Sequence, residues 1–162
     1  MTTNKRIDSV LMVCMGNICR SPTAEAVFRQ HAAQHQVTVH IDSAGTIGYH
    51  VGKKPDPRSM EAGQARGYDF ESIRSRRVVV EDFEHFDLLL AMDQANYEDL
   101  IALCPDESLR DKVVLMLDFS EQQKYSEVPD PYYGGQRGFE LVLDLIEDAS
   151  QGLVQHIIQS QR

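Results

Sequence analysis

The sequence predicts an α/β fold: a single three-layer domain whose open four-stranded parallel sheet carries helices on both faces. Short, continuously apolar segments alternate with longer segments of helical periodicity along the 162 residues. Such alternation is typical of parallel strands joined by right-handed crossovers, and continuous apolarity is typical of strands covered on both faces. No internal repeat or linker interrupts the pattern, so residues 1–162 are expected to form one flavodoxin-like domain with strand order 2-1-3-4.

Four segments are predicted as strands. The first and third contain continuous apolar runs, the second alternates and is rich in β-branched residues, and the fourth is a short apolar run. The predicted strands are residues 7–13, 37–41, 86–91 and 113–117. The glycine-rich stretch 43–52 is too irregular for an element, and residues 77–80 are expected to be a short extended piece before a helical turn at 81–83.

Four helices are predicted between and after these strands. Pro22 begins the first, Asp56 and Pro57 form a cap-and-proline start for the second, and Asp93 can cap the third. The last helix has apolar residues at roughly helical spacing. The predicted helices are residues 22–34, 57–65, 94–103 and 136–158. In an open parallel sheet ligands bind beyond the carboxyl ends of the strands, so the loops that follow the strands are the candidate sites.

The composition argues against several classes of function. The formal net charge is −9 and no basic face dominates, so nucleic acid is not expected as the main partner. No apolar stretch approaches a membrane span and residues 1–6 lack the apolar core of a signal peptide, so we expect no membrane partner and a cytoplasmic location. The three cysteines are better interpreted as free or reactive thiols than as a disulfide framework. Basic residues within 53–58 and 74–77 are either a solvated surface or a positive rim for anionic substrates.

The stretch 14–23, CMGNICRSPT, carries the strongest functional signal. It turns from a predicted strand into a predicted helix, so its backbone N–H groups point at one spot by the positive end of the helix dipole, which suits an anion. Cys14 begins the loop, and the planar guanidinium of Arg20 matches two phosphate oxygens. A Cys14 thiolate can attack phosphorus to form a cysteinyl-phosphate, and the Ser21 hydroxyl could ease its departure in a second step.

Such a mechanism also needs a general acid that protonates the leaving oxygen. Asp56 is explained as a helix cap and Asp118, at the end of the last predicted strand, is a weaker candidate. Asp130 lies in a glycine-flanked loop with no helix to cap at once. Tyr132 and Tyr133 beside it could wall a slot for an aromatic leaving group. Asp130 is therefore the preferred general acid.

Five short motifs stand in one order along nearly the whole chain: residues 13–22 (VCMGNICRSP), 42–46 (DSAGT), 55–57 (PDP), 91–93 (AMD) and 130–132 (DPY). Together they resemble the low-molecular-weight protein tyrosine phosphatases. The resemblance implies an enzyme that hydrolyses phosphotyrosine on tyrosine-phosphorylated proteins, binds phosphate and similar oxyanions, and uses no metal or other cofactor. It is also expected to be a monomer or a weak homodimer.

The resemblance implies roles for individual residues. Cys14 would be the nucleophile, Arg20 the phosphate-binding residue, and Asp130 the acid and then the base. The remaining substrate contacts would come from the loop and from an aromatic entrance: Met15, Gly16, Asn17, Ile18, Cys19, Ser21, Tyr49, Tyr132 and Tyr133.

Three further roles follow from the same resemblance. Asn17 and Ser43 would hold the strained loop in shape by hydrogen bonds. Cys19 would pair reversibly with Cys14 under oxidation and so protect the nucleophile from irreversible over-oxidation. Ile73 departs from the family pattern, because members often carry a histidine there that bonds the carboxylate matching Asp93. The partner of Asp93 therefore stays open, and a helix-cap role for it becomes more plausible.

Three alternative functions use the same kind of loop. A protein-arginine phosphatase would be expected to carry threonine where Ile18 stands. An arsenate reductase needs two further redox cysteines, whereas Met92 stands about where the first would be and Cys104 is alone and too late in the chain. A catalytically silent phosphopeptide-binding module would need neither the thiol of Cys14 nor the acid of Asp130. Phosphotyrosine hydrolysis is the preferred interpretation.

Overall fold

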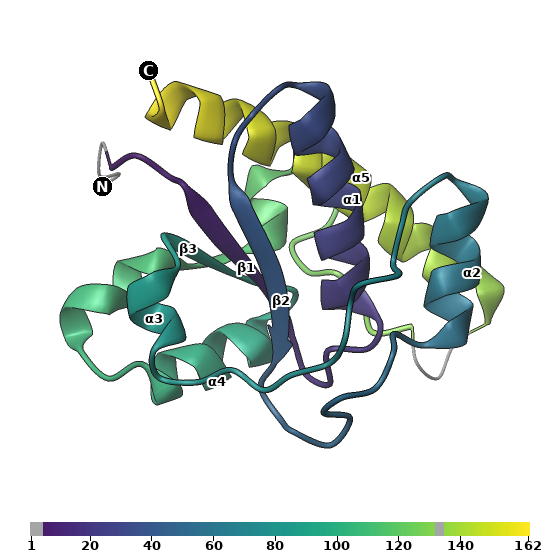
Figure 1. The fold of residues 1–162 in the computed structure, drawn as a ribbon, viewed down its shortest axis with the longest axis horizontal. Helices are drawn as coiled ribbons and strands as arrows, with labels where there is room; N and C mark the ends of the chain where they lie inside the picture. The colour runs from purple at the N-terminus through teal and green to yellow at the C-terminus, as the bar shows by residue number, and fades with distance from the viewer. Residues whose placement is uncertain (1–4, 132–134) are drawn as a thin grey trace.

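A computed structural model describes residues 5–131 and 135–162. Four parallel strands form one sheet in the order β2-β1-β3-β4, as the sequence predicts (Figure 1). The strands are β1 (Ser9–Cys14), β2 (His40–Gly45), β3 (Leu88–Ala91) and β4 (Val113–Leu115). All four point the same way, so the loops that follow them meet at one edge of the sheet.

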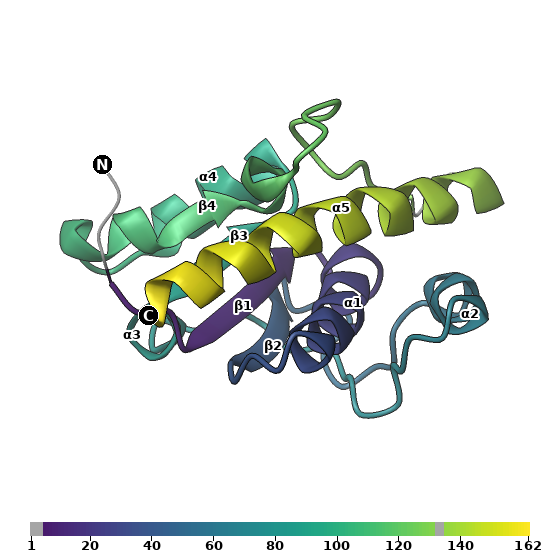
Figure 2. The same ribbon diagram turned by 90° about the horizontal axis from the view of Figure 1, so that it is seen from above.

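Helices cover both faces of the sheet, which confirms the predicted α/β class (Figures 1 and 2). One apolar cluster joins alternate β1 residues to α1 (Arg20–Gln34), α2 (Pro57–Ala65) and the long α5 (Gln136–Ser160). The other cluster joins the intervening β1 residues to α3 (Asp82–His85) and α4 (Gln94–Leu103). Successive strand residues therefore feed two separate cores, which explains why the strands are apolar throughout.

All four strands differ in their bounds from the predictions: β1 (Ser9–Cys14) and β3 (Leu88–Ala91) differ by one or two residues at an end from 7–13 and 86–91, and the other two strands differ more. The second strand was expected at 37–41, but β2 pairs with β1 from His40 to Gly45. Residues 37–39 instead form the connection, because the backbone N–H of Val37 donates to Ala32 O at the end of α1. The stretch from Ser43 to Gly45, predicted to be irregular, is the second half of this strand.

The last strand is also shorter than the predicted 113–117. β4 ends at Leu115, and Met116–Phe119 form a short 3-10 helix, η2. The Asp118 carboxylate accepts a hydrogen bond from the Leu115 backbone N–H at 3.2 Å, which closes this turn locally. A second 3-10 helix, η1 (Glu107–Lys112), precedes β4 and was not predicted. Within the ranges that the structure describes, no helix has the length and apolarity needed to cross a bilayer.

Candidate active site

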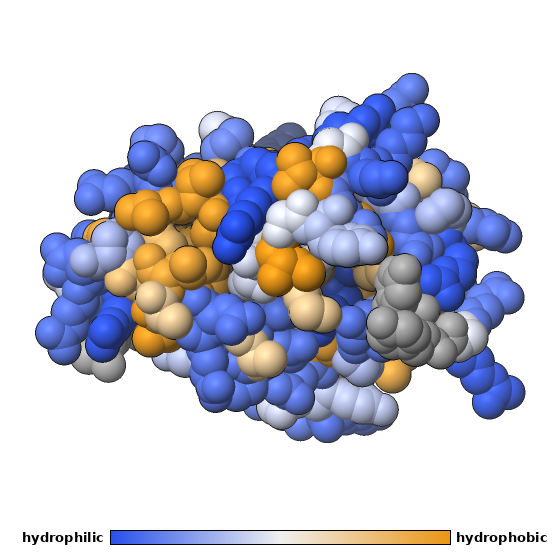
Figure 3. All heavy atoms as spheres, turned by 90° about the horizontal axis from the view of Figure 1, so that it is seen from below, coloured by the Kyte–Doolittle hydropathy of each residue, from blue (hydrophilic) through white to orange (hydrophobic). Residues whose placement is uncertain are grey.

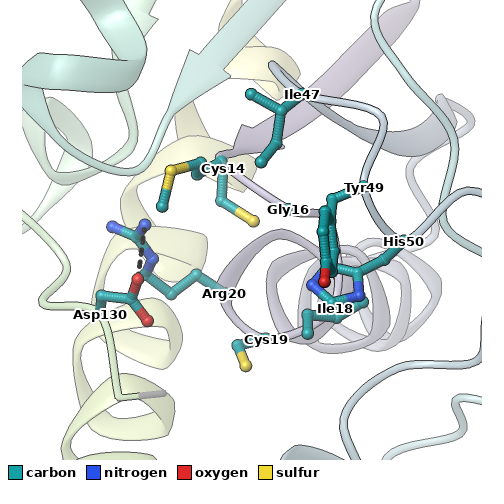
Figure 4. A pocket seen from close by; sticks show the side chains of 10 residues that line it. Cys14, Gly16, Ile18, Cys19, Arg20, Ile47, Tyr49, His50 and Asp130 are labelled. Atoms are coloured by element: carbon teal, nitrogen blue, oxygen red, sulfur yellow. Dashed lines mark ion pairs between the residues drawn. The ribbon is translucent and has the colours of Figure 1, made fainter. Parts of the chain in front are cut away.

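The loop between β1 and α1 forms the floor of a cavity of about 300 Å³ at the carboxyl edge of the sheet (Figure 4). Two further segments, one after β2 and one before α5, complete its walls. The lining residues are Cys14, Met15, Gly16, Ile18, Cys19, Arg20, Ile47, Tyr49, His50 and Asp130. The predicted nucleophile, phosphate-binding residue and general acid therefore face one space.

Cys14 lies at the bottom of this cavity, with its side chain pointing into it (Figure 4). Only 3% of the residue is exposed. Its Sγ lies 3.0 Å from the Ser21 hydroxyl oxygen and accepts a hydrogen bond from the Asn17 backbone N–H at 3.3 Å. These two contacts hold the sulfur of the predicted nucleophile in place at the floor of the cavity.

Asn17 holds the loop in a strained conformation. Its φ of 57° lies in the left-handed region, which costs a residue with a side chain about 1 kcal/mol. Its side-chain N–H donates to the Ser21 hydroxyl at 2.8 Å, and its side-chain oxygen accepts from the Arg76 backbone N–H at 3.0 Å. The Ser75 hydroxyl donates to Gly16 O at 3.1 Å. The loop is thus held from outside by residues 75–76, which the sequence analysis treated only as part of a basic cluster.

Ser43 does not make the hydrogen bond to the loop that the resemblance implied. Its hydroxyl donates to the buried Glu25 carboxylate at 2.6 Å, one helical turn beyond Ser21 in α1. The neighbouring Ala44 carbonyl accepts a long hydrogen bond from the Ser21 hydroxyl, at 3.5 Å. Burial raises the pKa of Glu25, and the Ser43 bond and the ion pair with Arg29 only partly offset that rise.

Arg20 is 3% exposed and fixed by three groups. Its Nη1 donates to the Asp93 carboxylate at 2.6 Å and to the Val128 carbonyl at 3.0 Å. Its Nη2 lies 3.7 Å from the Asp130 carboxylate. Burial lowers the pKa of Arg20, but the nearby Cys14 and the two carboxylates outweigh it and the net shift is upward. The guanidinium is therefore a permanent, well-oriented cation at the cavity.

The three aspartates considered as the general acid lie in different surroundings in the structure. Asp56 caps α2, accepting from the Arg58 backbone N–H at 2.8 Å, as predicted. Asp118 belongs to η2, where it bonds the Leu115 backbone. Among the described residues that line the cavity, Asp130 is the aspartate, and about a third of its side chain is exposed. This geometry suits proton exchange with a group bound above Cys14.

Comparisons with known proteins agree with this geometry. Residues 9–162 match the sequence profile of the low molecular weight phosphotyrosine protein phosphatases. A protein tyrosine phosphatase of Entamoeba histolytica, solved with Hepes in its active site, superimposes with a TM-score of 0.91 and 45% identity over 96% of this chain and 99% of that one. The low molecular weight phosphotyrosine protein phosphatase of Schizosaccharomyces pombe is 39% identical over 91% of this chain and 96% of its own length. YfkJ of Bacillus subtilis, a low molecular weight protein-tyrosine-phosphatase, is 38% identical over 92% of this chain and 95% of its own length.

The chain belongs to the low molecular weight phosphotyrosine protein phosphatase family. It is a cysteine-dependent phosphatase by that membership, which confirms the enzyme class that the sequence indicated. Ile73, at the position that departs from the family pattern, is 3% exposed and packs in the core. Asp93 has Arg20 as its partner through one oxygen, and through the other it caps α4 by accepting from the Asn96 backbone N–H at 2.7 Å.

The entrance of this phosphatase contains the predicted Tyr49 and two residues that the sequence did not single out, Ile47 and His50. Tyr49 is 82% exposed at the rim, as an entrance residue must be. The ring of His50 meets it edge-on, with the ring centroids 4.8 Å apart, and both lie beside Ile18 in Figure 4. Ile47 lies above Cys14 in the same view, and Arg20 and Asp130 lie across from Tyr49 and His50. No feature of the glycine-rich stretch distinguishes His50 or Ile47 in the sequence. The predicted contacts from Tyr132 and Tyr133 lie outside the described residues.

Cys19 also lines the cavity of the phosphatase, close to the nucleophile in sequence. Burial raises its pKa to about 12, with the Asp56 carboxylate adding to the rise. Cys14 and Cys19 are both free thiols in this structure. Cys19 is therefore protonated at neutral pH, which separates it from any role as a second nucleophile toward phosphate.

Proposed function

We propose that the protein hydrolyses phosphotyrosine in two steps through a cysteinyl-phosphate on Cys14. The observation that carries this proposal is the convergence of Cys14, Arg20 and Asp130 on one cavity. Family membership supports the substrate class, since the relatives are named as phosphotyrosine or tyrosine phosphatases. A phosphate bound there would meet the positive end of α1 and the Arg20 guanidinium.

In the first step the Cys14 thiolate attacks phosphorus. An S–P bond forms while the bond between phosphorus and the tyrosine oxygen breaks, and Asp130 gives that oxygen a proton. Arg20 stabilises the charge on the equatorial phosphoryl oxygens, because Asp93 and Val128 hold its guanidinium in place. The tyrosine of the substrate leaves with its hydroxyl restored, and the phosphoryl group stays on the Cys14 sulfur.

In the second step water attacks the cysteinyl-phosphate. Asp130, now ionised, accepts a proton from the water as the O–P bond forms and the S–P bond breaks. The departing thiolate of Cys14 is received by the Ser21 hydroxyl and the Asn17 backbone N–H, which already bond its sulfur. Inorganic phosphate then dissociates, and the enzyme returns to its starting state.

The depth of the cavity supports an aryl phosphate as substrate. Cys14 is almost fully buried, whereas Met15, Ile47 and Tyr49 at the rim are 46%, 43% and 82% exposed. A phosphorylated residue must therefore reach past an apolar rim, and an aromatic ring gains from packing against it. Ile18 in the wall is consistent with this preference and with a poor fit for phosphoarginine.

A protective disulfide between Cys14 and Cys19 is a second part of the proposal. Peroxide would oxidise the Cys14 thiolate to a sulfenic acid; the Cys19 thiol would then attack its sulfur, forming an S–S bond and releasing water. Both residues line the same cavity, which supports this pairing. A thiol reductant would restore the two free cysteines.

The deciding experiment compares turnover on matched peptides that carry phosphotyrosine, phosphoserine or phosphoarginine at the same position. We expect efficient hydrolysis of the phosphotyrosine peptide in the presence of EDTA, and loss of activity in Cys14→Ser. Rapid quenching in acid, followed by mass spectrometry, should reveal one phosphoryl group on the peptide that contains Cys14. Full activity in Cys14→Ser would overturn the mechanism, and a preference for phosphoarginine would overturn the substrate.

A further inference from the structure

A patch of exposed aliphatic side chains adjoins the catalytic cavity. We name it the valine platform and define it as Ile47, Val51, Val79 and Val80, which are 43%, 57%, 48% and 52% exposed. Figure 3 views the molecule from the side of the two segments that carry them and shows a broad apolar area on this face. An exposed apolar area of this kind beside a binding site commonly marks an interaction surface.

The backbone brings the two segments of the platform together. Gly45 and Arg77 form a parallel bridge, with Gly45 N donating to Arg76 O and Val78 N donating to Gly45 O, each at 2.8 Å. The bridge therefore sets the segment that leads to Ile47 beside the segment that leads to Val79. Val78 between them turns inward and is buried. Val79 and Val80 therefore belong to the surface of the protein, whereas Val78 belongs to its core.

The platform is continuous with the cavity through Ile47. This residue lines the cavity wall and is also a member of the platform. A peptide whose phosphotyrosine reached Cys14 would run over the rim at about 3.3 Å per residue. A residue one to three positions away from the phosphotyrosine would therefore lie about 3–10 Å along the rim, and a peptide that leaves the cavity past Ile47 would run toward the valines.

The charges around the platform favour an acidic partner segment. The whole chain carries a formal charge of −9 and Glu81, next to Val80, is exposed, but at the other end of the platform Arg77 is exposed, and so are Lys53 and Lys54 close to Val51 in the sequence. The Arg77 side chain passes over Gly48 together with Val51, because a Cβ on that glycine would lie 3.5 Å from both Arg77 Cδ and Val51 Cγ2. Its apolar stem adds to the platform while its guanidinium lies at the edge.

We propose that the valine platform binds the segment of the substrate next to phosphotyrosine, and selects a bulky aliphatic residue with a carboxylate beside it. The proposal rests on the phosphotyrosine activity argued above and adds the class of protein substrate to it. The cavity binds the phosphotyrosine itself, and the platform binds the residues on one side of it in the substrate sequence.

The test uses phosphotyrosine peptides that differ at single positions from −3 to +3, with leucine replaced by glutamine. We expect the wild-type enzyme to favour leucine at one or two positions on one flank by about tenfold in kcat/KM, the size expected for partial burial of one aliphatic side chain. In Val79→Thr/Val80→Thr this preference should fall to about twofold. Threonine keeps the shape of valine, and the backbone bonds of Val79 and Val80 with Asp82 and Phe83 stay available.

A second pair of peptides tests the charge. Aspartate in place of asparagine beside the leucine should raise kcat/KM about threefold for wild type and not for Arg77→Gln. Leu103→Gln is the matched control, because Leu103 is an exposed aliphatic residue at the far end of α4 and should leave both preferences intact.

p-Nitrophenyl phosphate has no flanking segment and separates the two proposals. If wild type fails to hydrolyse it and the peptides alike, the catalytic proposal is wrong. If all variants hydrolyse it equally but wild type shows no leucine preference, or the double variant keeps the full preference, the platform proposal is wrong. A change in oligomeric state with valine substitution, seen by light scattering without a change in peptide preference, would assign the platform to a second copy of the chain and overturn the proposal.

Discussion

Arg20 Nη1 and Asp93 Oδ2 lie 2.6 Å apart and join the catalytic loop to the start of α4. The other Asp93 oxygen caps that helix through the Asn96 backbone N–H. One carboxylate therefore both aims the phosphate-binding guanidinium and stabilises a helix. The two roles can be separated by substitution, because asparagine caps a helix about as well as aspartate but carries no charge.

Asp93→Asn should weaken phosphate binding and keep stability. We expect the inhibition constant for inorganic phosphate and KM to rise about tenfold, with the melting temperature close to wild type. Asp93→Ala should show the same loss of binding and also lose about 1 kcal/mol of stability from the missing cap. Thermal unfolding and phosphate inhibition measure the two effects. Unchanged phosphate inhibition in both variants would show that Asp93 does not position Arg20.

Asp130→Ala should impair hydrolysis in proportion to the need of the leaving group for a proton. We expect kcat for phenyl phosphate to fall about 10²- to 10³-fold, the usual range for loss of a general acid. p-Nitrophenolate leaves more readily without protonation, so kcat for p-nitrophenyl phosphate should fall less. Steady-state rates over a series of substituted phenyl phosphates give the dependence on the leaving group. Equal losses across the series would contradict the role of acid, and Asp118→Ala serves as the control for removal of a rival aspartate.

Asn17 allows the strain in the loop to be measured. Asn17→Ala and Asn17→Gly both lose the side-chain bonds to Ser21 and Arg76, but alanine alone carries the left-handed penalty. Asn17→Ala should therefore be about 1 kcal/mol less stable than Asn17→Gly in urea unfolding. Both should lose most of their activity, since the Ser21 hydroxyl is no longer held against Cys14. Equal stability of the two variants would mean that the loop relaxes on substitution.

Glu25 predicts a pH dependence of stability. Burial raises the folded-state pKa of this carboxyl above its ordinary value of 4.5, so the folded state binds the proton more readily than the unfolded state. The stability that Glu25 contributes is full below the unfolded pKa and is lost as the pH rises through the folded pKa. Glu25→Gln should therefore gain melting temperature relative to wild type as the pH rises from below the ordinary pKa of 4.5 through the raised folded-state pKa. Exposed Glu61→Gln is the control and should show a flat difference; a flat difference for Glu25→Gln would contradict the argument.

Cys19→Ser should keep basal turnover and lose protection against peroxide. The pKa of Cys19, raised to about 12, leaves a small thiolate fraction that grows about tenfold per pH unit. Protection in the wild type should therefore improve as the pH rises from about 6 to 8. Recovery of activity by dithiothreitol after a fixed peroxide pulse measures it, and mass spectrometry identifies the Cys14 sulfinic acid. Equal recovery of the two proteins at every pH would remove the protective role.

The sequence predicts the fold well because its strands and helices have strong local signals. The continuous apolar runs of β1 and β3 and the cap-and-proline start at Asp56 and Pro57 need no tertiary information. The errors in the predicted bounds occur at residues whose structure depends on strand pairing. Residues 37–39 have the composition of a strand, but the register of β2 against β1 begins at His40. Strand pairing is a long-range contact that single-segment patterns do not contain.

The active site likewise has a part that the sequence predicts and a part that depends on long-range contacts. The loop from Cys14 to Ser21 is contiguous, so its residues and spacing can be interpreted directly. The support by Ser75 and Arg76 and the entrance position of His50 depend on where distant segments meet. Ser43 was assigned to the loop by resemblance, yet here its hydroxyl bonds Glu25. Contacts between segments that are distant in the sequence leave no periodic pattern in it, so these contacts could not be predicted.

The two residues that brace the catalytic loop, Ser75 and Arg76, belong to no helix or strand. The Arg76 guanidinium reaches Asp82 in α3 and Asp42 in β2, so the brace is itself tied to the edge of the sheet. Edge segments open locally at a lower free energy than the core unfolds. A brief detachment of this segment would free the strained loop while the sheet stays intact. Enzyme activity would then be lost at a lower denaturant concentration than the one that unfolds the protein. Activity would therefore serve as a sensitive probe of local opening at this edge of the sheet.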